Sequence, residues 1–285
     1  MAKSAVENDE VHVYEPHRVG LPKIGPYFRD LWARMEFAAE FSKSGIRAAN
    51  TQTVFGQLWL VLNPLLLALV YYILVSVLRG SSGGIAFLAH LTGGLFLFYF
   101  ISGSITNGAG SVTGGGRLIM NMNFPRLLMP FAAVRTAFFR FLPTIPVYLL
   151  LHILSGAGWS PLMLLSVVFL GYSVVFCLGA AALFATAQVY FRDTSSFLPY
   201  FIRIWLYLSP ILWEASEISK YDPIYGKLVY LNPLYSIIGG WTDLSLRGIM
   251  PPPAMWIVGA LWAAFAVVVG SLVFMSRERD FAVRL

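Results

Sequence analysis

Residues 54–78 are the feature of this sequence that most constrains its fold. The stretch VFGQLWLVLNPLLLALVYYILVSVL contains no charged residue and is flanked by Arg47 and Arg79. As an α-helix it would measure about 37 Å, enough to cross a bilayer core of roughly 30 Å with some tilt. A soluble core helix of this length normally shows a polar stripe, and this one does not. The stretch therefore predicts the first of several membrane spans.

The composition extends this interpretation to the whole chain. Of its 285 residues, 58% are hydrophobic and only 12% are charged, and the mean hydropathy is +0.69. A soluble domain carries about twice that fraction of charged residues. We therefore expect an all-α polytopic membrane protein, without room for a large soluble catalytic domain among its spans.

The net charge of +6 could indicate a nucleic-acid partner. In a membrane protein, lysines and arginines retained on cytosolic loops give the same excess, so we expect no nucleic acid. The single Cys177 lies in an apolar run, which excludes an intrachain disulfide and a cysteine-based metal site.

The first fifty residues are more polar than the rest. Residues 1–26, with scattered proline and glycine, predict a flexible cytosolic tail, because no apolar segment there is long enough for a signal peptide. Residues 27–43 alternate apolar and charged side chains at helical spacing, which predicts an amphipathic helix lying in the membrane interface. A helix docked on the protein is the alternative. The apolar face comprises Phe28, Leu31, Trp32, Met35 and Ala39.

Five further apolar stretches complete a predicted six-span domain over residues 54–275. Pro143 and Pro146 should kink the third span. Residues 214–241 are too short and too broken for a straight crossing, which predicts a re-entrant pair of half-helices between spans five and six. Spans two to six are expected at about residues 85–106, 127–154, 162–190, 196–213 and 254–275.

The charges predict the orientation. Basic residues gather before span one, between spans two and three, between spans four and five, and after span six. The opposite side keeps only Arg79, Lys220, Lys227 and Arg247. The positive-inside rule therefore places both termini, including a C-terminal tail of residues 276–285, in the cytosol of a cell with this protein in its cytoplasmic membrane.

Enzyme signatures are mostly missing. The glycine-rich GAGSVTGGGR (108–117) lacks the lysine of a nucleotide-binding loop. The four histidines have no metal-ligand spacing, and no two carboxylates fall together inside a span, as ion coupling would require. We expect a protein that is not an enzyme, binds no cofactor of its own and draws its energy from elsewhere.

Two cytosolic connections could dock a soluble partner. Residues 107–130 should begin as a flexible loop, become amphipathic over 117–122 and stop at Pro125. Residues 188–197 contain Arg192 and Asp193, where Asp193 or Thr194 could cap the next helix. An ordinary loop and a capped turn are the alternatives.

Five motifs occur in the order and spacing of one family. They are FGQLWLVLNPL (55–65), NFPRLLMP (123–130), YFRDTSSF (190–197), LSPILW (208–213) and LNPLYSIIGG (231–240). From about residue 45 onward, the chain resembles the membrane subunits of ABC-2 type exporters, the Wzm-type polysaccharide and teichoic-acid permeases.

This resemblance implies a homodimer that pairs with two copies of a separate cytosolic ABC ATPase, which binds the ATP and magnesium. It also implies a gate helix over residues 45–53 and a re-entrant hairpin at the outer mouth. Many relatives carry a tyrosine near Asn50, where this chain has a polar residue. The implied ATPase-coupling residues are Arg117, Leu118, Met122, Asn123, Phe124, Pro125, Arg126, Arg192 and Asp193.

Aromatic residues inside the spans favour a sugar polymer as substrate. Aromatic faces stack on sugar rings, and tyrosine hydroxyls form hydrogen bonds without a fixed charge, which suits a polymer that must slide. Lipid-facing packing and interfacial belts are the alternative. The candidate lining residues are Trp59, Tyr71, Tyr72, Tyr200, Trp205 and Tyr207.

Arginines at membrane depth cost about 3 kcal/mol each unless they find a partner or water. We hypothesise that they bind the diphosphate of a lipid-linked substrate; snorkelling to ordinary lipid phosphates is the alternative. The candidate contacts are Arg47 and Asn50 near the gate, Arg135 and Arg140 in span three, and Arg203 in span five.

Together these features predict the permease subunit of an ABC transporter that exports a polyprenyl-diphosphate-linked polysaccharide and performs no covalent chemistry. An exporter of drugs or lipids, a membrane enzyme acting on polyprenyl phosphates and a structural scaffold are the alternatives. The sequence does not distinguish O-antigen, teichoic acid and cell-wall galactan as the polymer.

Overall fold

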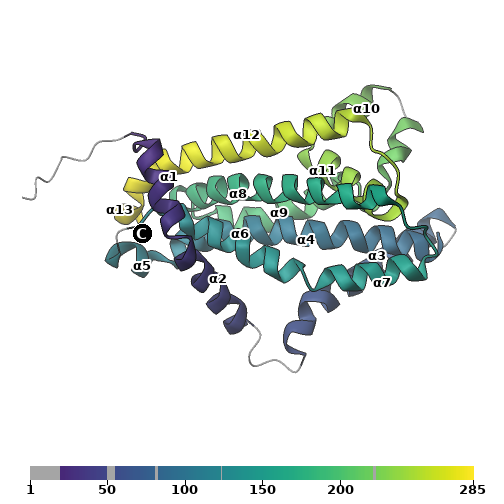
Figure 1. Ribbon diagram of the computed structural model, residues 1–285, viewed down its shortest axis with the longest axis horizontal. Coiled ribbons are helices and arrows are strands. Elements are labelled where there is room, and N and C mark those ends of the chain that lie inside the picture. The colour runs from purple at the N-terminus through teal and green to yellow at the C-terminus, as the bar shows by residue number, and fades with distance from the viewer. Residues whose placement is uncertain (1–19, 50–54, 81–82, 123, 221–222) are drawn as a thin grey trace, which may run out of the picture.

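The computed structural model describes residues 20–49, 55–80, 83–122, 124–220 and 223–285. The predicted all-α polytopic fold is confirmed, because every regular element in these ranges is helical. Five helical stretches are long and apolar enough to cross a membrane, and they run side by side along the long axis of the molecule (Figure 1). These stretches are α3 (Trp59–Arg79), α4 (Gly84–Gly114), α6 (Leu128–Phe141) with α7 (Thr144–Leu154), η2 (Pro161–Leu165) with α8 (Ser166–Tyr190), and α12 (Pro253–Arg277) with its C-terminal extension.

The predicted fifth span, residues 196–213, is wrong in its extent. Helix α9 (Thr194–Leu208) has 15 residues, so it rises about 22 Å and is shorter than a bilayer core. It ends because Ser209 takes an extended conformation before Pro210, as residues preceding proline generally do. The described residues therefore contain five helical stretches of spanning length instead of the predicted six.

The second span is longer than predicted. Residues 107–114, expected as a flexible loop, are part of helix α4, which has 31 residues in all. A Cβ atom at Gly108 would lie 2.5 Å from the Cβ of Ala181 in α8, so glycine lets the two helices touch. This packing outweighs the low helix propensity of glycine.

The predicted kink in the third span is confirmed at Pro143. Helices α6 and α7 are separated there, and Pro143 is the residue that precedes α7. Pro146 causes no break, because it lies in the first turn of α7, where the missing N–H has no intrahelical partner to lose.

The predicted amphipathic N-terminal helix is divided in two. Helix α1 (Ile24–Ala33) and helix α2 (Met35–Ala49) are separated at Arg34. Leu31 is buried against the protein, whereas Phe28 and Trp32 are exposed. The apolar residues therefore serve both protein packing and the outer surface, and the interfacial location stays a prediction. Of the predicted gate region, α2 covers residues up to Ala49, and residues 50–53 lie outside the described ranges.

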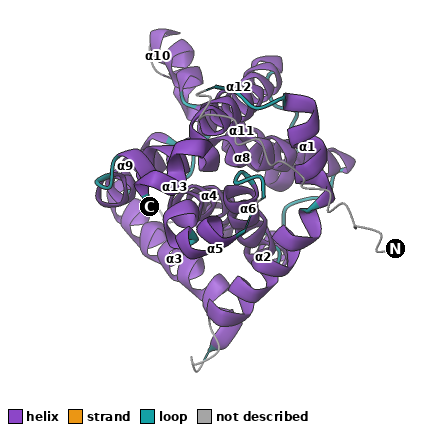
Figure 2. Cartoon of the chain, turned by 90° about the vertical axis from the view of Figure 1, so that its left-hand side faces the viewer, coloured by secondary structure: helices purple, strands orange, loops and turns teal. Residues whose placement is uncertain are grey.

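The segments predicted to be cytosolic meet at one end of the molecule, here called the terminal end. The Tyr27 hydroxyl donates a 2.6 Å hydrogen bond to Glu278, and Arg126 donates to the Glu278 carbonyl. Tyr190, at the end of α8, donates a 2.8 Å hydrogen bond to Asp280. Figure 2 views this end and shows α1, α2, α5 (Gly116–Asn121) and α13 (Phe281–Arg284) on it. Which side of the membrane this end faces stays a prediction.

The C-terminal residues are folded onto the terminal end. They form the short helices η6 (Glu278–Asp280) and α13. Phe281 is fully buried, and its ring lies 5.1 Å from that of Phe274. The predicted tail is therefore part of the packed structure.

The opposite end, here called the distal end, carries the segment predicted to be re-entrant. It contains η3 (Ala215–Lys220), α10 (Pro223–Leu228), η4 (Val229–Leu231), α11 (Pro233–Thr242) and the π-helical turn η5 (Asp243–Arg247). Residues 234–242 of α11 are all buried, whereas α10 is largely exposed. The predicted interruption of the chain is confirmed, and its re-entry into a membrane stays a prediction.

Asn232 fixes the start of α11 against the end of α9. Its side-chain oxygen accepts hydrogen bonds from the Leu234 N–H at 3.0 Å and from the Trp205 indole at 2.7 Å. Its side-chain amide donates to the Leu208 carbonyl at 2.9 Å. The Asn-Pro pair thus serves as an N-cap and as a link between two short helices.

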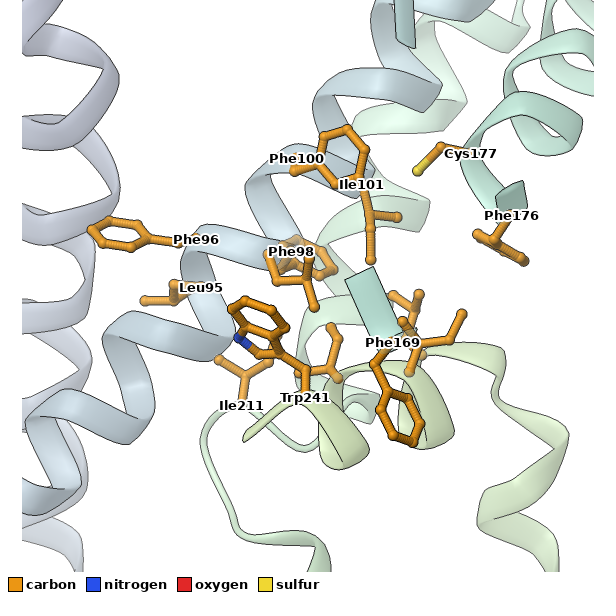
Figure 3. Close-up of a cluster of buried hydrophobic side chains, with 14 of the residues drawn as sticks. Leu95, Phe96, Phe98, Phe100, Ile101, Phe169, Phe176, Cys177, Ile211 and Trp241 are labelled. Atoms are coloured by element: carbon orange, nitrogen blue, oxygen red, sulfur yellow. The ribbon is translucent and has the colours of Figure 1, made fainter. Parts of the chain in front are cut away.

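Helix α4 forms the centre of the bundle. Its buried residues Leu95, Phe98 and Ile101 belong to one core cluster with Phe169 of α8 and Trp241 of α11 (Figure 3). Of its most apolar stretch, 72% is buried, against 17% for α3. Helix α4 is therefore packed against other helices on most sides and exposes one face. That face is the candidate functional surface.

Candidate functional site

The open face of α4 is a polar strip. Beyond Phe98, the residues of α4 that are not buried recur at intervals of three and four, which places them on one side of the helix. We define the polar strip as Tyr99, Ser102, Gly103, Thr106, Asn107, Gly110 and Thr113.

The chemistry of the strip is unlike that of a lipid-facing surface. It contains hydroxyls, an amide and glycines, and it has neither an aliphatic side chain nor a charge. By contrast, the exposed residues of α3 include Leu66, Val70 and Leu74. Polar side chains in a span normally face the interior of an assembly or water. The strip is therefore suited to a polar conduit.

A cavity of about 200 Å³ adjoins the strip. Its walls include Trp59 and Asn63 of α3, Tyr99 and Asn107 of α4, and Arg140 of α6. The structure thus brings together Trp59, predicted as an aromatic lining residue, and Arg140, predicted as a phosphate contact. No carboxylate of the described residues forms an ion pair with Arg140, so its charge is free for an anion.

A second group of predicted residues lies where α3 and α9 meet. The rings of Tyr71 and Tyr207 are 6.4 Å apart at an angle of 81°. Tyr71 is also within electrostatic reach of Tyr99, in the strip, and of Arg203. Tyr200 is exposed and shares a helical face with Arg203 and Tyr207. Three helices therefore contribute aromatic and polar groups to neighbouring surfaces.

Trp205 and Tyr72 lie away from these groups. Trp205 donates to Asn232 and packs against Phe201, with ring centroids 5.0 Å apart. The ring of Tyr72 lies 6.4 Å from that of Phe87, toward the distal end. Their contacts are those of packing residues, and a lining role for them stays a prediction.

Arg135 has partners within the protein. It donates a 2.9 Å hydrogen bond to the Ala39 carbonyl, and its guanidinium lies 4.8 Å from the centre of the Phe139 ring. These contacts tie α2 to α6 and explain how the arginine is stabilised without a ligand. For the predicted gate contacts, the Arg47 side chain and all of Asn50 lie outside the described residues.

The predicted ATPase-coupling segment forms helix α5 on the terminal end. Leu118 and Met122 line a groove of about 890 Å³ together with Phe37 and Phe41 of α2. Met122 is 47% exposed, and Met120, which the sequence did not single out, is 59% exposed. The groove is therefore apolar and accessible. The Arg117 side chain and all of Asn123 lie outside the described residues.

The end of the same segment is buried. The Phe124 ring lies 5.5 Å from that of Phe37, and Pro125 is buried beside it. Burial lowers the pKa of Arg126, which binds the Glu278 carbonyl. In this structure these three residues hold the coupling segment in place, and their predicted contact with an ATPase stays a prediction.

Arg192 and Asp193 are exposed in the turn before α9. Of the two residues considered as caps, Asp193 occupies the N-cap position of α9, but its side chain forms no capping hydrogen bond. Its main-chain carbonyl accepts from the Phe197 N–H at 3.0 Å instead. Arg192 lines a cavity of about 300 Å³ with Ser195 and Arg284, so both coupling candidates lie on the terminal end.

Sequence reasoning missed Asn63, Tyr99 and Asn107. Tyr99, Thr106 and Asn107 were visible as small or polar residues at helical spacing, a pattern that apolar content obscured. Asn63 carries no such signal, because it is a single amide in an apolar stretch.

Comparison with known proteins identifies the family. No protein-family model matches the chain. The chain is 30% identical over 208 residues to an O-antigen export system permease protein RfbA of Klebsiella pneumoniae, covering 72% of this chain and 78% of that protein. It is 25% identical over 261 residues to a protein of the same name from Myxococcus xanthus, covering 89% and 97%. The chain therefore belongs to the family of the O-antigen export system permeases.

Proposed function

We propose that this chain is the membrane subunit of an ABC exporter that moves a polyprenyl-diphosphate-linked polysaccharide out of the cytosol. The observation that carries the proposal is the polar strip of α4. It runs from Tyr99 to Thr113, which is about 21 Å of helix. An uncharged polar surface of this length is expected to face water and a polar substrate, because its polar groups would find no hydrogen-bond partners in the lipid.

The chemistry of the strip fits a sliding sugar chain. The hydroxyls of Ser102 and Thr106 and the amide of Asn107 can each form hydrogen bonds with sugar hydroxyls, and Tyr99 offers an aromatic face. None of these groups is charged, so each contact is weak and can be exchanged. Conduction needs binding that is strong enough for entry and weak enough for release.

One copy of the chain supplies only one wall of such a conduit, because the strip is open. We therefore propose that a second copy closes it, with the exposed faces of α3 and α9 at or near the contact. The two copies would pair with two copies of a separate ATPase, which supplies the energy.

The cavity beside the strip suits the head of the substrate. Arg140 offers a guanidinium that has no carboxylate partner among the described residues, and a guanidinium binds phosphate oxygens well. Trp59 and Asn63 of the same cavity provide an aromatic face and an amide. We propose that the diphosphate contacts Arg140 while the first sugars reach the strip.

The groove beside α5 is the proposed ATPase site. Its exposed methionines, Met120 and Met122, are flexible apolar side chains of the kind found at adaptable binding surfaces. Because the ATPase is cytosolic, this proposal places the terminal end, with α1 and the C-terminal helix α13, in the cytosol.

Polymer export by variants of the strip tests the proposal. Thr106→Leu and Asn107→Leu replace polar groups by an apolar side chain of similar or larger size, and should lower export at least about tenfold in a strain that lacks its own permease. The matched control is Val268→Leu on the exposed face of α12, which should export normally. All variants must still capture the ATPase. Normal export by both strip variants would contradict a conduit along α4.

A further inference from the structure

The distal end contains a cavity that the proposed conduit does not use. Its volume is about 460 Å³, within the range of ordinary ligand sites. Its walls come from the end of α3, the start of α4, the loop of residues 155–158 and the turn η5. The 31-residue length of α4 separates it from the terminal end.

The charges around this cavity balance locally. Arg79 lies 3.1 Å from Glu217, and Arg247 forms an ion pair with Glu214 and lies 3.5 Å from Asp243. Arg79, Arg247 and Glu214 line the cavity directly. The walls therefore present hydrogen-bond donors and acceptors side by side, without a surplus of positive charge to select an anion.

His90 supplies the second observation. It lines the same cavity and is only 3% exposed. Neither ring nitrogen of His90 forms a hydrogen bond of good geometry with the described residues, although the Trp213 backbone is close enough to interact with the imidazole. Buried polar groups are nearly always hydrogen-bonded in native proteins. A hydroxyl group that enters the cavity would supply a partner for this imidazole.

We propose that the cavity is a subsite for one sugar residue of the exported polymer. A neutral imidazole has one donor and one acceptor nitrogen, as a sugar hydroxyl has one donor and acceptor lone pairs. A guanidinium paired with a carboxylate likewise offers a donor and an acceptor to a hydroxyl group. A neutral ligand rich in hydroxyls is thus the class that matches both His90 and the balanced charges.

This inference rests on the proposed function, which places the distal end outside the cell. The subsite would then bind a sugar after the chain has left the strip. Arg247 and Glu214 flank α11 in the sequence, and His90 and Arg79 belong to the spans. A bound sugar would therefore bridge the distal segment and the spanning bundle.

Direct binding of methyl glycosides tests the subsite. The permease is purified with its ATPase in lipid nanodiscs, and saturation-transfer NMR is recorded with the methyl glycosides of galactose, mannose and rhamnose. Inorganic phosphate is the comparison ligand. Two variants alter the cavity: His90→Phe removes the imidazole nitrogens and keeps a ring of similar size, and Ala157→Trp fills the space.

His152→Phe is the matched control. His152 is also buried, at 1% exposure, and its nitrogens form no hydrogen bond with the described residues, but it is not among the residues that line the cavity. At least one glycoside should bind to the wild type and to His152→Phe. Binding should weaken about fivefold or more in His90→Phe, as expected for one lost hydrogen bond, and disappear in Ala157→Trp. The thermal unfolding temperature of each variant reports whether it is folded.

The outcomes distinguish failure of the sugar subsite from failure of the exporter proposal. Absence of any glycoside signal from the wild type, equal binding by His90→Phe, or preferential binding of phosphate would each overturn the sugar subsite. Capture of the ATPase is read from the same preparation. If the ATPase is captured normally, such a result leaves the exporter proposal intact, whereas failure of the wild type to capture it would contradict that proposal instead.

Discussion

Phe281→Ala should detach the C-terminal segment from the coupling helix. Phe281 is fully buried, with its ring 5.1 Å from Phe274. Beyond it, Leu285 lies against α5: a Cβ built at Gly116 would be 3.8 Å from the Leu285 Cβ. Helix α13 therefore braces the segment that we propose binds the ATPase.

The size of the effect follows from the burial. Truncation of a buried phenylalanine to alanine costs about 3–5 kcal/mol. Because the segment is terminal, we expect the loss to appear as local opening and not as global unfolding. A cost of about 3 kcal/mol multiplies the open population roughly 100-fold.

Hydrogen exchange with mass spectrometry measures this opening. Amides of residues 276–285 and of α5 should lose protection in Phe281→Ala, while α4 keeps its protection. Affinity for the ATPase should fall in parallel. Val283→Ala is the matched control, because Val283 belongs to the same short helix and is 84% exposed. Unchanged exchange in Phe281→Ala, or an equal change in Val283→Ala, would refute the bracing role of α13.

Three further predictions concern single side chains. Asn232→Ala should lower the free energy of unfolding by about 2–3 kcal/mol. The Trp205 indole and the Leu234 N–H would lose their acceptor, and the Leu208 carbonyl would lose its donor. A thermal unfolding temperature equal to that of the wild type would contradict this. Arg140→Gln should depress the ATPase activity stimulated by lipid-linked substrate, leaving basal activity and assembly intact, and undiminished stimulation would remove the phosphate role. Burial raises the pKa of Asp243 from 3.8 to about 6, so the folded protein binds more protons than the unfolded chain between these values and stability falls as pH rises through them. Asp243→Asn removes this titration, so the unfolding temperature of the variant should vary less between pH 4 and pH 6 than that of the wild type. An equal pH dependence in the two proteins would contradict this prediction.

The spanning helices were predictable because each crossing needs a long apolar run, and residues 54–78 or 254–275 could hardly be placed otherwise. The ends of these helices were not. Gly108 and its neighbours suggest a flexible loop until the contact with Ala181 is known. Phe281 lies in a charged segment that suggests a tail, and only the tertiary fold buries it.

The types of residue in the candidate site were predictable from the sequence. The side of the helix on which each side chain lies was not. Trp205 and Tyr207 are both aromatic and only two positions apart, but residues at that spacing point to nearly opposite sides of a helix. Trp205 consequently meets Asn232, whereas Tyr207 meets Tyr71. Arg135 and Arg140 also have different surroundings. Arg135 donates a hydrogen bond to the Ala39 carbonyl of α2, a contact that depends on the position of α2 and that no local sequence pattern reveals.

Cysteine accessibility along α4 tests the polar conduit most directly. Single cysteines are introduced in a Cys177→Ala background and treated with a membrane-impermeant thiol reagent in the assembled complex during transport. Cysteines at strip positions 102, 106 and 110 should react from the aqueous phase, and those at buried positions 101, 105 and 109 should not. Reaction of the strip positions only with a lipid-dissolved reagent, or not at all, would contradict the claim that the open face of α4 lines an aqueous path.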